Sequence, residues 1–238
     1  MFLRKIKDIS ISNKSISVTR EANISVDEIE RQIEQIDYQP AIGEKGDRSE
    51  NARVPPFIQV FYYLFFAKLK IPTEAAFWST YLNWVKGDDR EGKIVIEGKS
   101  YEAAGLKKRL NRTYPSLIRD LHFLYLLDAS QKFEHVEYSM HRDYFNGLDL
   151  KVTYNNKEAF ISLFIDTSRA RYFKEKKTRR HDYSMIHEIE LNVAFRSLSK
   201  LGSIYVLNEQ HIELLENLLN ETKKHRNIYT WASRKIRG

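Results

Sequence analysis

The chain has no cysteine among its 238 residues, which excludes disulfides, thiolate metal sites, cysteine nucleophiles and dithiol redox chemistry. It also lacks a Walker loop and the Gly-x-Gly-x-x-Gly, Gly-x-Ser-x-Gly and His-Glu-x-x-His patterns. P-loop NTPase, dinucleotide-binding, α/β-hydrolase and zinc-protease functions therefore lack sequence support. The seven histidines show no zinc-ligand spacing.

Long apolar runs are missing too. The most apolar stretch, residues 57–67, is much shorter than the about 20 residues that a membrane-spanning helix needs. The basic start of the chain, residues 1–8, lacks the apolar stretch of a signal peptide. We therefore expect a cytoplasmic protein without a membrane partner.

The chain carries a net charge of +7, and its hydrophobic fraction of 42% is sufficient for a core. An excess of cations favours an acidic partner such as nucleic acid. The basic residues cluster at 107–112, at 169–180 and after Glu221. The alternative interpretation of each cluster is a solvated helix face or a frayed tail.

The first half, residues 1–112, is expected to be a mainly helical region with a small β-hairpin. Alternating isoleucines on either side of Asn13 predict the hairpin. Ser25 is predicted to cap a helix, and Ser100 to cap another that ends in the first basic cluster. Two aromatic-rich helices are predicted between them, at 55–69 and 73–86.

The second half, residues 113–238, is expected to be a separate α/β domain. Thr113 and Pro115 predict the start of a helix that runs to about residue 127. The almost continuously apolar segment 159–165 is typical of a central strand covered on both faces. Further predicted elements are strands at 136–140, 148–154, 186–193 and 203–207, a basic helix after Thr167 or Ser168, and a last helix capped by Asn208.

Asp120 lies on the apolar face of its predicted helix, three residues after Leu117 and four before Leu124. An ionised carboxylate there needs an ion pair, hydrogen bonds or a metal ion. Pairing with Arg119 or Lys132 would satisfy it as well as a metal would. Two further carboxylates, Asp149 and Asp166, lie at the start of one predicted strand and at the end of the central one.

This order of elements resembles the PD-(D/E)XK nuclease superfamily, which has the restriction-endonuclease-like fold, over residues 113–207. The segments that carry the resemblance are Gly-Leu-Asp-Leu-Lys-Val around Asp149 and Asn-Asn-Lys-Glu-Ala-Phe-Ile-Ser-Leu-Phe after it. The resemblance implies a mixed sheet flanked by helices. It also matches Asp120 to the family's helix acid and Asp149 to its strand Asp, and implies Mg²⁺ or Mn²⁺ as cofactor.

The sequence departs from the family's Glu/Gln-x-Lys motif, because Ser162 and Phe164 stand at those two positions. Asp166 lies two residues further on the same face, and Lys151 or Arg169 could supply the missing cation. The candidate catalytic residues are therefore Asp120, Asp149, Asp166 and Lys151, and the three aspartates are the candidate metal ligands.

The segment after Asp166 is the candidate nucleic-acid surface. As a helix it would place Arg169, Tyr172, Lys176 and Arg180 on one stripe. With about four to six phosphate contacts, log affinity would fall against log salt with a slope of about −4 to −5. Tyr172 could stack on a base or pack on the sheet. The candidate nucleic-acid-binding residues are Arg169, Tyr172, Lys176, Lys177, Arg179 and Arg180.

Three functions remain open from the sequence. The first is nucleic-acid binding by a nuclease-like fold, with metal-dependent phosphodiester cleavage in an altered site, as in restriction or mobile-element proteins. The second is an inactive pseudo-nuclease that binds DNA, RNA or a nucleotide. The third is an interaction module whose helices at 55–69 and 73–86 dock onto a protein partner or a second copy of the chain.

Overall fold

The structure, a computed structural model, describes residues 24–41, 54–87, 92–96, 98–138, 148–167 and 188–221. It also describes the backbone of short strands at 4–6, 11–12, 15–16, 20–22 and 89–90. Contacts divide the chain into two compact units. The first comprises Met1–Tyr125 with Lys200–Val206, and the second Leu126–Ser199 with Leu207–Gly238.

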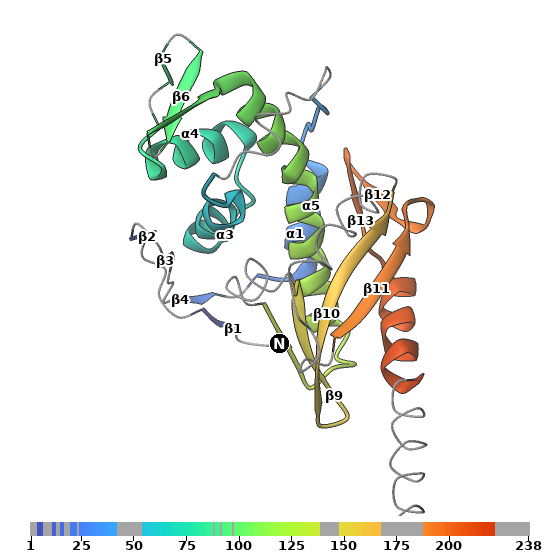
Figure 1. The fold of residues 1–238 in the computed structure, drawn as a ribbon. Coiled ribbons are helices and arrows are strands. Elements are labelled where there is room, and N and C mark those ends of the chain that lie inside the picture. The colour runs from blue at the N-terminus through green and yellow to red at the C-terminus, as the bar shows by residue number, and fades with distance from the viewer. Residues whose placement is uncertain are drawn as a thin grey trace, which may run out of the picture. The chain divides into compact units, whose positions relative to one another are not determined.

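Short antiparallel strands begin the first unit (Figure 1). Strand β2 (Ile11–Ser12) pairs with β3 (Ser15–Ile16), which confirms the predicted hairpin. Outside it, β1 (Arg4–Ile6) pairs with β4 (Arg20–Ala22).

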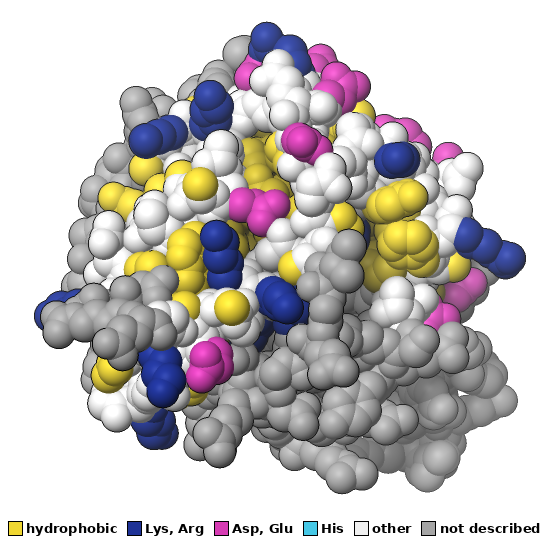
Figure 2. Space-filling model, turned by 90° about the horizontal axis from the view of Figure 1, so that it is seen from above, with side chains coloured by type: hydrophobic (Ala, Val, Ile, Leu, Met, Phe, Trp, Pro, Cys, Tyr) yellow, Lys and Arg dark blue, Asp and Glu magenta, His cyan; other side chains and the backbone are white. Residues whose placement is uncertain are grey.

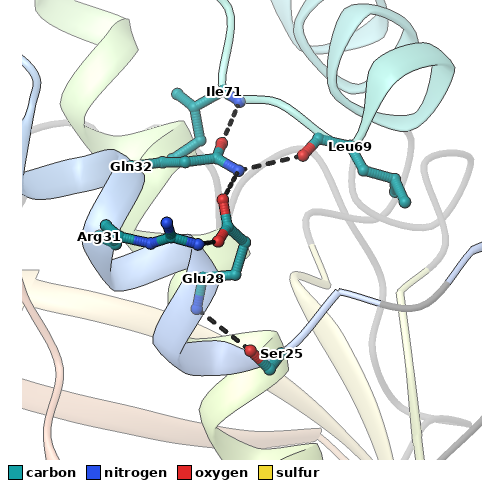
Figure 3. A network of polar contacts seen from close by, with 6 residues as sticks. All are labelled: Ser25, Glu28, Arg31, Gln32, Leu69 and Ile71. Atoms are coloured by element: carbon teal, nitrogen blue, oxygen red, sulfur yellow. Dashed lines mark hydrogen bonds and ion pairs between the residues drawn. The ribbon is translucent and has the colours of Figure 1, made fainter.

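Helix α1 (Val26–Glu34) begins as predicted, because the Glu28 N–H donates to the Ser25 hydroxyl at 3.2 Å. The Glu28 carboxylate does not close a capping box; it pairs with Arg31 and accepts from Gln32 at 3.0 Å. Gln32 also donates to the Leu69 carbonyl at 3.2 Å and accepts from the Ile71 N–H at 2.8 Å (Figure 3). One amide therefore joins α1 to a segment far along the chain.

Helices α3 (Phe57–Lys68) and α4 (Glu74–Trp84) confirm the two predicted aromatic helices. Pro56 precedes α3, Leu69 ends it in the left-handed conformation (φ 52°), and Thr73 caps α4 by accepting from the Ala76 N–H. Because α3 is apolar around most of its circumference, it lies in the core of the unit.

Aromatic edge-to-face contacts connect these helices. The ring centroids of Phe57 and Tyr81 are 4.6 Å apart, and those of Phe61 and Phe77 are 5.7 Å apart. Phe61 also lies 6.2 Å from Tyr114 of the next long helix. Such pairs add specific geometry to the burial of apolar area.

A three-stranded antiparallel sheet follows α4, in the order β5-β6-β7. Its strands are β5 (Asp89–Arg90), β6 (Lys93–Ile96) and β7 (Lys99–Glu102). The prediction that Ser100 caps a helix was wrong, because Ser100 pairs with Val95 in this sheet. The buried side chains of β6 pack in a cluster beside the start of the following helix. This packing favours a strand over the predicted helix start at this position.

Helix α5 (Ala103–Ala129) is continuous, so the predicted helix start at Thr113 was wrong. Pro115 lies inside the helix, where it has no N–H to donate. The Thr113 hydroxyl donates to the Arg109 carbonyl at 2.9 Å. The buried stripe through Leu110, Tyr114 and Ile118 runs past the proline without a break, and its packing outweighs the local signal. The predicted division at 112–113 falls within α5 and stays a prediction about domain organisation.

The second unit contains a four-stranded mixed sheet in the order β11-β10-β9-β8 (Figure 1). Strands β8 (His135–Glu137), β9 (Leu150–Tyr154) and β10 (Lys157–Asp166) are antiparallel neighbours. Strand β11 (Glu188–Ala194) runs parallel to β10 on its other side. The predicted central position of residues 159–165 is therefore confirmed.

The turn between β9 and β10 is formed by Asn155 and Asn156, which both have positive φ (52° and 59°). Asparagine tolerates this conformation, as two-residue hairpin turns require. After β11 follow the short helix η1 (Phe195–Ser197), strands β12 (Ser199–Leu201) and β13 (Ile204–Val206), and a helix over residues 209–221. Helices and mixed sheets together confirm an α/β protein.

Candidate functional site

The two faces of the four-stranded sheet differ in chemistry. One face is apolar and buried, with Val152, Ile161, Ile189 and Leu191 among its side chains. By strand alternation and register, the opposite face carries Phe160 and Phe164 together with the polar residues Glu137, Lys151, Thr153, Glu158, Ser162, Glu188 and Glu190. The second face is the candidate functional surface.

Asp149 lies immediately before β9, against the middle of β10. Its N–H donates to the Ile161 carbonyl at 2.9 Å, and its Oδ2 accepts from the Leu163 N–H at 2.5 Å. The carboxylate is therefore held beside Ser162, the residue at the family's Glu/Gln position.

Ser162 is 6% exposed, and its hydroxyl donates to the Glu188 carboxylate at 2.5 Å. Glu188 is the first residue of β11, opposite Phe160 in the parallel register. The family has an acid or amide side chain at the position of Ser162, and here the Glu188 carboxylate of the neighbouring strand lies beside that position. Glu188 could not be identified from the sequence, because only the register of β10 with β11 brings it to Ser162.

Lys151 lies on the same face but is engaged by two carboxylates. Its ammonium is 2.8 Å from Glu158 Oε1 and 3.2 Å from Glu137 Oε2. The hydrogen bond to Glu158 is the main cause that raises the pKa of Lys151 above its usual value. The residue is therefore protonated near neutral pH, and it is suited to fix strands or a phosphate, not to remove a proton.

Asp120 and Asp166 lie in different units of the structure. Asp120 is half-buried on α5, next to Arg119, whose Nε donates to the Tyr205 carbonyl at 2.9 Å. Lys132, the other cation considered for Asp120, pairs with Glu216 at 2.6 Å. Asp166 ends β10 opposite Ala194. In the ranges that the structure describes, no three or more His, Asp or Glu side chains are grouped so that they could hold a metal ion.

The predicted nucleic-acid residues Arg169, Tyr172, Lys176, Lys177, Arg179 and Arg180 lie outside the described residues, as does the basic tail after residue 221. In the basic cluster of α5, Lys107 is exposed, whereas the Arg109 guanidinium lies 5.6 Å from the centroid of the Phe57 ring. Figure 2 shows the described Lys and Arg side chains on one side of the molecule dispersed among acidic and uncharged ones. This visible part of the surface therefore has no continuous basic patch.

Ser197 and His211 form a serine–histidine pair that is not arranged as a catalytic dyad. The Asn208 N–H donates to His211 Nδ1 at 3.0 Å, so the ring proton is on Nε2. Nε2 lies 3.0 Å from the Ser197 hydroxyl, which itself donates to the Ala194 carbonyl. His211 thus donates to the serine instead of accepting its proton, and the group stabilises the start of the helix at 209–221.

No helix in the described part of the chain has the length and apolarity to cross a membrane. The chain matches no protein-family model, and it resembles neither a curated protein nor a solved structure at a significant level.

Proposed function

We propose that the chain is a nucleic-acid-binding protein whose second unit is a restriction-endonuclease-like core with an altered active site. The single observation that carries the proposal is the meeting of Asp149, Ser162 and Glu188 on one face of a mixed sheet. The sheet has three antiparallel strands after a helix and a fourth strand parallel to the third, and a mixed sheet of this kind supports the proposal.

The net charge of +7 and the basic segment 169–180 support a polyanionic partner. That segment lies in the connection between β10 and β11, the two strands that present Ser162 and Glu188. The basic segment therefore directly connects two strands of the polar sheet face.

Binding is tested with labelled duplex and single-stranded DNA and RNA over a range of salt concentrations. Arg169→Ala with Lys176→Ala should weaken binding and flatten the salt slope by about 1 for each lost phosphate contact. The matched control, Lys157→Ala with Lys200→Ala, removes the same charge from exposed positions in other segments. If both double variants bind like the wild type, the basic segment is only a solvated surface.

Metal-dependent cleavage is the second candidate, in which Asp149 and Glu188 would hold Mg²⁺ or Mn²⁺ together with water. Carboxylate oxygens are the ligands that Mg²⁺ prefers. Because Ser162 and Phe164 replace the usual acid and lysine, and Lys151 is paired, we expect slow cleavage or none. General acid–base assistance alone is often worth about 10²–10⁴-fold.

The two candidates are separated by calorimetric titration of both metals and a plasmid-nicking assay. Asp149→Asn should abolish metal uptake and nicking while leaving the fold intact, since an amide oxygen can still accept from the Leu163 N–H. Glu188→Gln should weaken both, and the exposed Glu209→Gln serves as the control. A wild type that neither binds metal nor nicks DNA would leave the binding module as the function.

Helices α3 and α4 give little support to the hypothesis that the chain is a protein-interaction module. Phe57, Phe61, Phe65, Phe77 and Tyr81 are all buried in the first unit. Docking of a protein through these helices would have to use other side chains.

A further inference from the structure

We propose that the start of the helix at 209–221, in the second unit, is an acid-sensitive cap that opens when the His211 ring takes up a second proton. The inference does not depend on the proposed function, because it involves none of the residues on the polar face of the sheet. The helix is drawn in orange-red in Figure 1. Its first residue is Glu209, so Asn208 is its N-cap residue.

The cap uses the side chain of His211 in place of the usual acid or amide. In a capping box, the side chain at the third helical position accepts from the N–H of the N-cap residue. His211 holds that third position, and its Nδ1 accepts from the Asn208 N–H at 3.0 Å. The Asn208 side-chain amide donates to the Ser197 carbonyl at 3.1 Å and to the Ser199 hydroxyl at 2.8 Å. Histidine and asparagine together therefore fix the helix start to the preceding segment.

The neighbours of the ring determine its protonation state. The Ser197 hydroxyl donates to the Ala194 carbonyl at 2.7 Å, so its oxygen accepts from His211 Nε2, which lies 3.0 Å away. Nε2 therefore carries the proton and Nδ1 the lone pair of a neutral imidazole. A second proton, on Nδ1, would point at the Asn208 N–H, which is itself a donor. The ring can take up that proton only if the cap hydrogen bond breaks.

The surroundings of the ring also oppose its charged form. His211 is 3% exposed, and burial lowers its pKa below the ordinary value. On η1, on β12 and in the first turns of the helix, the charged side chains are Arg196, Lys200, Glu209 and Glu213, and all four are exposed. Exposed groups are screened by solvent, so these four provide no buried counter-charge for an imidazolium.

Protonation therefore favours a state in which the helix start has opened. The first N–H groups of a helix have no intrahelical partner, so loss of the cap leaves the first turn weakly held. Ile212 and Leu215 are buried one turn further on, and their packing depends on that turn. Because the pKa of His211 is lower in the folded chain, the cap is stable above the ordinary histidine pKa and is lost as pH falls below it.

Hydrogen exchange of the full chain at pH 7.5 and pH 5.5 tests the inference, with each rate divided by the intrinsic rate at that pH. The protection of amides 208–214 should fall about tenfold, because a released ring with an ordinary pKa near 6.5 is mostly protonated at the lower pH. The amides of β10, in the same unit, should keep nearly constant protection, since the opening is local.

His211→Gln is the decisive variant, because glutamine also suits the third position of a capping box. Its amide oxygen can accept from the Asn208 N–H and its amide nitrogen can donate to Ser197, but it does not titrate. The variant should keep the protection seen at pH 7.5 and lose the fall at pH 5.5. His135→Gln removes a ring that is 62% exposed on β8, and it should keep the full fall.

Each outcome decides the inference. A fall confined to amides 208–214 in the wild type and in His135→Gln, and absent in His211→Gln, supports it. Unchanged protection in the wild type, an equal fall in β10 or a persisting fall in His211→Gln overturns it. If His211→Gln does not fold, the nitrogen chemical shifts of the wild-type His211 ring decide. A neutral ring with its proton on Nε2 that titrates below pH 6.5 is expected, and titration at or above that value overturns the cap.

Discussion

Gln32 is a single uncharged side chain that connects two distant segments of the first unit. Its amide bonds Glu28 on its own helix and both the Leu69 carbonyl and the Ile71 N–H after α3. Ile71 is 6% exposed, so its N–H has little access to water. A donor left unsatisfied in such a place costs about 1–3 kcal/mol.

We therefore expect Gln32→Ala to lower the free energy of unfolding by about 1–3 kcal/mol. Urea denaturation monitored by circular dichroism measures it. Arg31→Ala, which removes a side chain that is 68% exposed from the same helix, should change stability by less than about 0.5 kcal/mol. Equal effects of both variants would contradict the role given to the amide.

His122 predicts the pH dependence of stability. The ring is 1% exposed, its Nε2 lies 2.9 Å from Glu30 Oε1, and burial lowers its pKa below 6.5 despite that carboxylate. Burial lowers the pKa of His211 as well. Below about pH 6.5 these two rings therefore bind more protons in the unfolded chain than in the folded chain. The free energy of unfolding should therefore fall as pH decreases through this window.

Urea midpoints between pH 8 and pH 5 check this prediction. His122→Gln should flatten the decrease below about pH 6.5, since one proton-binding group is removed from the unfolded state. A variant that keeps the full wild-type slope would show that His122 does not titrate differently in the two states.

At the scale of elements, β10 is the strand that organises the second unit. It lies between β9 and β11, and Ile161 is fully buried while Leu163 is only half-buried. Strand alternation places both residues on one face, but burial along that face decreases toward the carboxyl end of the strand. Leu163 is therefore only partly covered, although it shares a face with Ile161.

Ile161→Ala should cost about 2–5 kcal/mol, because a cavity forms in a fully packed position. Leu163→Ala should cost less, about 1 kcal/mol, in proportion to the apolar area it buries. Thermal or urea unfolding of both variants compares them directly. A larger loss for Leu163→Ala would mean that β10 is covered differently from the arrangement described.

Helix α5 shows how packing can outweigh a local signal. Thr113 and Pro115 together are typical of a helix start, yet they lie inside one helix from Ala103 to Ala129. Proline in a helix interior is unfavourable by about 3 kcal/mol relative to alanine. The aromatic contacts of Tyr114 with Phe61 and Phe77 hold this segment in place from outside the helix.

At the scale of the whole molecule, α5 belongs to both compact units, because one of the boundaries between them falls between Tyr125 and Leu126. A cut at 112–113 would divide the helix and remove Tyr114, Ile118 and Leu121 from the core of the first unit. We therefore expect fragments 1–112 and 113–238 to lack cooperative unfolding when expressed separately. Circular dichroism melting curves provide the measurement. Two cooperative fragments would support the domain division predicted from sequence.

Short-range patterns were enough to predict several elements correctly. The Ser25 cap, the helix that starts at residue 73 and the apolar run of β10 all depend on neighbours within a few residues. Their geometry follows from side-chain hydrogen bonds, backbone preferences and the two-residue period of a strand. The α/β class follows from the same local signals.

The candidate site depended on contacts between residues far apart. Nothing near Glu188 in the chain indicates that it meets Ser162; the parallel register of β10 with β11 brings the two together. The same holds for the pairing of Lys151 with Glu137 and for the amide of Gln32. Registers and helix continuity are decided by the burial of whole apolar faces, which sums many distant contacts and is not encoded in any short segment.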